Sequence, residues 1–188
     1  MKKIFQSYKT LPTDVWWLLG ADVALQLINA AFALLLNYVM IDHGYKDYDI
    51  TSINGNRYLA VLICAYPLTL ISERINLKNL LLIGSVTAPL LSLATLWCIH
   101  FHISELLRLV TFLWGVSFSL VQIMALPILM NITTEENETE AISLFFAIGS
   151  FTTIICGLFN YLANLVFPDF SNISLLALYC FVACFGPF

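Results

Sequence analysis

Long apolar runs dominate the chain, and short polar segments separate them at similar intervals. A helix needs about 20 apolar residues to cross the hydrocarbon core of a bilayer. The signal Pro12-Thr13-Asp14 marks where the first such helix begins. The pattern predicts six membrane-spanning helices, at residues 14–41, 50–71, 77–100, 104–130, 140–167 and 172–188. The last run is short, so we expect its helix to be truncated by the end of the chain.

Composition supports a membrane protein of the all-α class. Hydrophobic residues make up 60% of the chain, charged residues only 11%, and the mean hydropathy is +0.88. Soluble domains carry charge on about a quarter of their residues. The net charge of −4 offers no basic patch, so we expect no nucleic-acid partner. The five cysteines form no CxxC pair and are expected to be small buried hydrophobes, with no metal and no cofactor: Cys64, Cys98, Cys156, Cys180 and Cys184.

Basic residues near helix ends predict the orientation of the chain, because they resist translocation. A cytoplasmic N-terminus puts Lys2, Lys3, Lys9, Arg74 and Lys78 inside, against Lys46, Arg57 and Arg108 on the other side. We therefore expect a multi-pass protein of the plasma (inner) membrane. Its cytoplasmic segment is residues 1–13, and its six-helix bundle is residues 14–188.

Polar residues form a stripe on the first helix. Asp22, Gln26, Asn29 and Asn37 fall within about 80° of a helix circumference, because each residue turns the helix by about 100°. Exposing Asp22 to lipid would cost about 2.5–3.5 kcal/mol or more. This face must therefore meet water or polar neighbours.

The fourth helix carries a similar stripe. Arg108, Thr111, Gly115, Ser119 and Gln122 also fall within an arc of about 80°. Two polar stripes in one apolar chain suggest that they face a common aqueous space.

Three stretches together carry a family resemblance. They are HGYKDYDITSINGNR (43–57), PLTLISERINLKN (67–79) and RLVTFLWGVSFSLVQIMALP (108–127). In this order and spacing they resemble the N-terminal six-helix half of a major facilitator superfamily (MFS) transporter. The resemblance covers nearly the whole chain.

The turn between the second and third helices resembles the family's charged turn, Gly-x-x-x-Asp-Arg-x-Gly-Arg-Arg/Lys. Glu73, Arg74 and Lys78 match its acid, its arginine and its final base, whereas Thr69 and Asn76 replace its glycines. The resemblance implies a cytoplasmic gate, in which these charges pair with helix ends of the other half. An alternative is that the basic residues only set the topology.

The resemblance also implies that the first and fourth helices line the central cavity, while the second and fifth meet the other half. The implied substrate-cavity residues are Asp22, Gln26, Asn29, Thr111, Ser119, Gln122 and Arg108. Asp22 would suit reversible proton uptake, would serve as a structural hydrogen-bond partner, or would contact the substrate directly. Arg108 would hold an anionic substrate, would extend to the membrane interface, or would pair with Glu105. Arg57 in the second helix has the same ambiguity.

These observations predict a secondary active transporter of a small solute that works by alternating access. The chain would be its N-terminal half, and its partners would be the solute, the bilayer and a missing C-terminal half. One alternative is a non-transporting six-helix membrane subunit or fragment. A membrane-embedded enzyme is a weaker alternative, because catalysis needs paired His, Ser or carboxylate groups within helices, and none is evident. We therefore expect no enzymatic activity.

Overall fold

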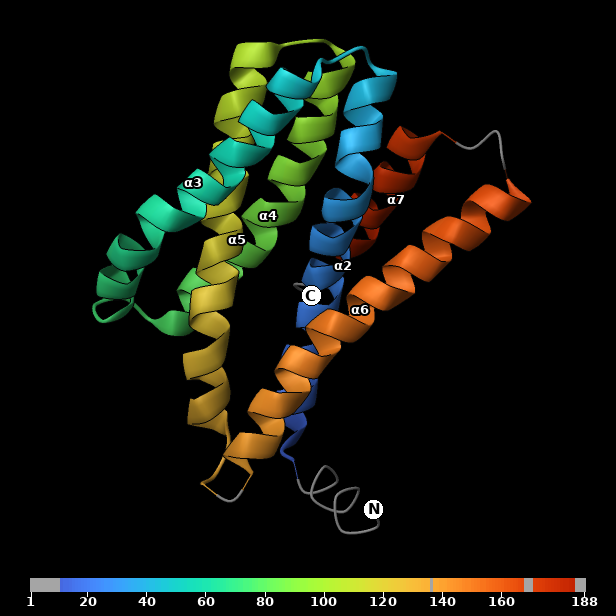
Figure 1. Cartoon of the computed structure of the whole chain (residues 1–188). Helices are drawn as coiled ribbons and strands as arrows, with labels where there is room; N and C mark the ends of the chain where they lie inside the picture. Colours follow the sequence, from blue (N-terminus) through green and yellow to red (C-terminus); the bar gives the residue numbers. More distant parts are fainter. Residues whose placement is uncertain (1–10, 136, 168–170, 185–188) are drawn as a thin grey trace.

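The computed structural model describes residues 11–135, 137–167 and 171–184. Within these ranges the chain forms six α-helices and no strand (Figure 1). The helices are α2 (Thr13–Asp42), α3 (Asp47–Ser72), α4 (Leu77–His100), α5 (Ser104–Ile132), α6 (Glu138–Val166) and α7 (Asn172–Cys184). By length and composition, α2, α4, α5 and α6 are able to cross a membrane. The chain is therefore an all-helical, membrane-embedded protein.

The other two helices fall short of this criterion for different reasons. α3 is 26 residues long, but its first half carries Asn54, Asn56 and Arg57. α7 has 13 residues in the described range, and residues 185–188 of the expected sixth span lie outside the described residues. Most of the expected cytoplasmic segment, residues 1–10, also lies outside them. Membrane crossing by α3 and α7 remains a prediction.

Local chemistry sets the helix ends. α3 begins at Asp47 instead of residue 50, and Asp47 and Asp49 lie in its first turn, where carboxylates favour the positive end of the helix dipole. Asn76 caps α4, since its side chain accepts a hydrogen bond from the Lys78 backbone N–H at 3.0 Å. Gly44, between α2 and α3, has φ +77°, which glycine adopts without strain.

Close backbone approach determines how α5 packs against its two neighbours. A Cβ on Gly84 of α4 would lie 3.0 Å from the Ser117 carbonyl oxygen of α5. A Cβ on Gly115 of α5 would lie only 2.4 Å from the Arg57 carbonyl oxygen of α3. Small residues allow such contacts between membrane helices. α5 therefore lies tightly against both α3 and α4.

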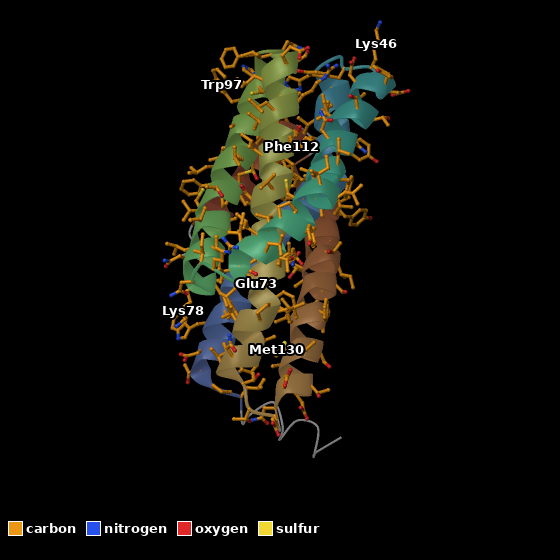
Figure 2. All side chains as sticks on the ribbon, turned by 90° about the vertical axis from the view of Figure 1, so that its left-hand side faces the viewer. Lys46, Glu73, Lys78, Trp97, Phe112 and Met130 are labelled. Carbon is orange, nitrogen blue, oxygen red and sulfur yellow. The ribbon has the colours of Figure 1, made fainter. Side chains whose placement is uncertain are left out.

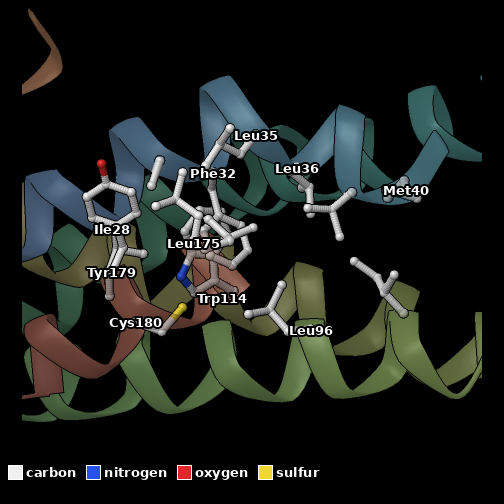
Figure 3. Close-up of a cluster of buried hydrophobic side chains, with 14 of the residues drawn as sticks. Ile28, Phe32, Leu35, Leu36, Met40, Leu96, Trp114, Leu175, Tyr179 and Cys180 are labelled. Carbon is white, nitrogen blue, oxygen red and sulfur yellow. The ribbon is translucent and has the colours of Figure 1, made fainter. Parts of the chain in front are cut away.

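The largest apolar cluster consists mainly of side chains from α2, α4, α5 and α7, and α3 and α6 contribute a few more (Figure 3). At its centre the rings of Phe32 and Trp114 lie 4.8 Å apart, and both side chains are fully buried. Tyr179 of α7 donates a hydrogen bond to the Asn160 Oδ1 of α6 at 2.8 Å. This bond fastens α7 to α6.

α3 and α6 diverge from the bundle on opposite sides of it (Figure 1). In an apolar segment of 18 residues, 17% of the residues are buried in α6, compared with 56% in α5. The exposed apolar side chains of α3 include Leu62 and Ile63, and those of α6 include Phe151 and Ile154. These two helices thus present apolar surface that the described part of the chain leaves uncovered.

Candidate functional site

Five polar side chains from three helices meet in one cavity. We call it the amide cavity, and its non-aromatic polar lining consists of Gln26, Asn29, Arg57, Ser119 and Gln122. The cavity lies between α2, α3 and α5 and has a volume of about 420 Å³. The structure therefore brings together four of the seven cavity residues expected from the sequence, two from each polar stripe.

Arg57 is the fifth polar residue of this cavity, and its side chain is only 7% exposed. Its Nη2 donates a hydrogen bond to the Asn29 Oδ1 across the gap between α3 and α2. Its guanidinium carbon lies 3.8 Å from the ring centre of Trp114 and 5.5 Å from that of Tyr58. Among the described residues it forms no ion pair. The cavity thus contains a buried cation held by an amide and an aromatic face.

Sequence reasoning did not include Arg57 among the cavity residues. The resemblance assigned the second helix to the interface with another half, so Arg57 was considered as an anion-binding alternative but was not placed among the cavity residues. The available signal was the polar stretch INGNR, which places three amide or guanidinium side chains inside a helix. A polar cluster at that depth is costly unless it faces a cavity.

Ser119 contributes an oxygen acceptor to the amide cavity. Its hydroxyl is buried and donates to the Gly115 carbonyl oxygen at 2.8 Å, which leaves the oxygen lone pairs as acceptors. Gln26 and Gln122 are half-buried and contribute amide groups, which both donate and accept. The lining can therefore bind either a donor or an acceptor group on a solute.

Asp22 does not line the amide cavity. It lines a second cavity of about 320 Å³ between α2, α4 and α5, together with Asp14, Lys78 and Ser85. Asp22 is 4% exposed, and both of its carboxylate oxygens lack a hydrogen-bond partner among the described residues. The Gln26 amide, one turn further along, interacts with this carboxyl group but does not reach hydrogen-bond geometry.

This separation corrects the expectation that Asp22 and Gln122 face one shared space. α3 meets α2 near the turn that joins them and slants away from it toward the other end of the bundle (Figure 1). Nearer the N-terminus of α2, α4 and α5 are therefore the neighbours that close the cavity at Asp22. The stripe is continuous along the helix, but the helices that it faces change along its length.

Two residues of the fourth-helix stripe also lie away from both cavities. Thr111 is buried, and its hydroxyl donates to the Leu107 carbonyl oxygen at 2.9 Å. Arg108 pairs with Glu105 at 3.6 Å, and its side chain is 40% exposed. The structure thus shows the ion pair that the sequence left open as an alternative for Arg108. At this end of α5, the polar side chains of the stripe therefore bond to the backbone of α5 or lie at the surface, and they line neither cavity.

The expected gate residues lie at the turn between α3 and α4 (Figure 2). Glu73, Arg74 and Lys78 are exposed, and within the described part of the chain none of them forms an ion pair. Lys78 also lines the Asp22 cavity together with Asp14. This lysine therefore links the charged turn to the cavity that contains the buried carboxylate.

Aromatic rings gather at the opposite end of the bundle. The ring centre of His43 lies 6.1 Å from that of His100 and 6.3 Å from that of His102. The Tyr45 ring stacks on the His102 ring, with their centres 5.6 Å apart. Burial of its phenol raises the pKa of Tyr45, and the nearby Cys98 and Asp49 raise it further. Across the described ranges, no group of His, Cys, Asp and Glu side chains is arranged to hold a metal ion.

Comparison with known proteins gives no closer identification. The chain matches no protein-family model, no curated protein and no solved structure.

Proposed function

We propose that this chain is the N-terminal half of an MFS-type secondary active transporter, which binds a small solute in the amide cavity. One observation carries the proposal: side chains from α2, α3 and α5 converge on this cavity from positions inside long helices. Polar side chains are expensive within a membrane and usually mark the path of a substrate or ion. Its volume of about 420 Å³ lies within the usual range for small-molecule sites, about 300–1,000 Å³.

The uncovered faces of α3 and α6 support the need for a second half. Alternating access works by rocking two helical bundles around a site between them. One bundle leaves its site open on one side, and here α3 and α6 present exposed apolar residues such as Leu62 and Phe151. We place the partner half against these two helices.

The charged turn between α3 and α4 fits a gate in such an assembly. Glu73, Arg74 and Lys78 are exposed at a helix end, where they can pair with helix ends of the other half. This placement follows from a cytoplasmic N-terminus, which puts the turn on the cytoplasmic side. The other end of the bundle, near Lys46, then faces outward (Figure 2).

Asp22 is our candidate for proton coupling. Its carboxyl group is buried, lacks a hydrogen-bond partner among the described residues, and lines a cavity separate from the amide cavity. A group in that position can gain and lose a proton without touching the solute. In pH-dependent uptake assays, Asp22→Asn should abolish the dependence of transport on the proton gradient.

Cysteine accessibility tests the proposed function. In the natural full-length protein with its native cysteines replaced, Gln122→Cys is exposed to a charged, membrane-impermeant thiosulfonate in right-side-out and inside-out vesicles. Such a reagent reacts only where water reaches the thiol. The matched control is Leu90→Cys, an exposed apolar position on α4 that we expect to face lipid.

Alternating access predicts that the reagent modifies Gln122→Cys from each membrane face and Leu90→Cys from neither. Modification of Gln122→Cys from one face only would indicate a closed pocket instead of a transport path. Modification from neither face would favour the non-transporting subunit. Either of these results would overturn the proposed function.

A further inference from the structure

We propose that the amide cavity selects a small solute bearing an oxyanion, either a carboxylate or a phosphate, which binds to the Arg57 guanidinium. This inference rests on the proposed function, since it names the class of solute that the same cavity accepts. Four features carry it: the charge of Arg57, the absence of a counter-ion near it among the described residues, the neutral donors around it and the volume of the space.

Arg57 keeps its positive charge under all ordinary conditions and offers five N–H donors in a planar fork. In the structure this fork donates to the Asn29 Oδ1 and lies against the Trp114 ring. Neither neighbour carries a negative charge. A cation that is 7% exposed is therefore held by neutral groups, an arrangement that costs free energy unless a counter-ion completes it.

The described part of the chain provides no carboxylate to neutralise Arg57. Asp22 is the acid on the same face of α2 as Asn29, but it lines the other cavity and does not pair with Arg57. Glu105, on the same helix as Ser119 and Gln122, pairs with Arg108 instead. The amide cavity consequently has a net positive charge that its own walls leave uncompensated.

Neutral polar groups around Arg57 suit the remaining atoms of such a solute. The Gln26 and Gln122 amides can donate to further oxygens of an anion, and Ser119 can accept from a hydroxyl. Arginine binds carboxylate and phosphate through two parallel hydrogen bonds, which gives both strength and orientation. A cavity of about 420 Å³ has room for a small organic anion.

Equilibrium binding of radiolabelled phosphate and radiolabelled lactate tests the inference. The full-length protein is held in lipid nanodiscs at constant ionic strength, and uncharged methyl glucoside serves as the neutral probe. We expect saturable binding of lactate, of phosphate or of both, and none of methyl glucoside. The probe that binds more tightly distinguishes carboxylate from phosphate.

Two variants separate anion binding from a merely structural role of Arg57. Arg57→Gln removes the cation and should weaken anion binding by about tenfold or more, because hydrogen bonds to charged groups are lost. Gln122→Glu keeps Arg57 and its contacts with Asn29 and Trp114 but places a carboxylate in the cavity. It should cause a similar loss even if Arg57→Gln fails to fold.

Each variant has a matched control outside the cavity. Arg108→Gln removes an arginine from the end of α5, and Asn79→Asp adds a carboxylate at an exposed position of α4. Both should bind the anions as the unmodified protein does. The inference is overturned if methyl glucoside binds and neither anion does, or if Gln122→Glu retains full anion binding.

The two proposals can fail separately. Anion binding without modification of Gln122→Cys from both membrane faces would reject transport but keep the anion site. Modification of Gln122→Cys from both faces without anion binding would keep transport but reject the oxyanion as its substrate class.

Discussion

Replacing Gly115 with alanine should force α3 and α5 apart. A methyl group at this position would lie 2.4 Å from the Arg57 carbonyl oxygen and 2.9 Å from the Ala60 Cβ. Both atoms belong to the backbone or to a short side chain, so neither can rotate away. Relief of the clash requires α3 to move, and Arg57 and the wall of the amide cavity would move with it.

The size of the effect follows from two opposing contributions. Alanine is favoured over glycine inside a helix by about 1 kcal/mol, which would stabilise the variant. Overpacking a well-packed interface costs about 1–3 kcal/mol, and a contact as short as 2.4 Å to backbone places Gly115→Ala at the upper end of that range. We expect a net loss of about 1–2 kcal/mol in the free energy of unfolding.

Gly20→Ala is the matched control, because it makes the same change inside α2, where nothing lies within 4 Å of the added carbon. Gly20→Ala gains the stability that alanine gives inside a helix and creates no clash. The difference in free energy of unfolding between the two variants therefore measures the clash alone. The free energies of unfolding are measured by titrating the protein from mild detergent into SDS and following helix content by circular dichroism. Equal stability of Gly115→Ala and Gly20→Ala would refute the close approach of α3 to α5.

The same measurement tests two further contacts. Tyr179→Phe removes the hydrogen bond to Asn160 and should lower the free energy of unfolding by about 0.6–1.7 kcal/mol, whereas Tyr161→Phe, at an exposed position, should leave it unchanged. A loss that is equal in both variants would argue against a bond between α6 and α7. Asp22→Asn removes a buried carboxylate that has no hydrogen-bond partner among the described residues and should stabilise the protein at alkaline pH by up to about 2.5–3.5 kcal/mol. Asp14→Asn, at an exposed position in the same cavity, should give no such gain, and a destabilised Asp22→Asn would mean that the carboxylate has a partner.

The helices could be predicted closely from the sequence. All six expected helices are present in the described ranges, and α4 has the bounds 77–100 that its apolar run indicates. The clearest difference is the start of α3, where Asp47 and Asp49 extend the helix into a segment that hydrophobicity alone excludes. Hydrophobic runs report where side chains avoid water, whereas helix ends depend on capping and dipole effects within single turns.

The candidate site could be predicted only in part. Gln26, Asn29, Ser119 and Gln122 belong to one cavity, as the two stripes indicate. Thr111 belongs to the same arc as Ser119, but its hydroxyl donates to its own helix backbone and it lines neither cavity. Angular position on a helix shows which residues share a face, but it does not show what that face meets at each level.

The amino-acid sequence is enough to show that the chain is a membrane-embedded helical protein, roughly where its helices lie and which of their faces are polar. These properties follow from the preference of each segment for lipid or water, and they need no knowledge of its neighbours. The packing of the helices, in contrast, places Asp22 and Gln122 in different cavities and brings Arg57 into the amide cavity. The reason is that helices cross at angles, so the partner of a given face changes along its length and depends on contacts such as that of Gly115 with α3.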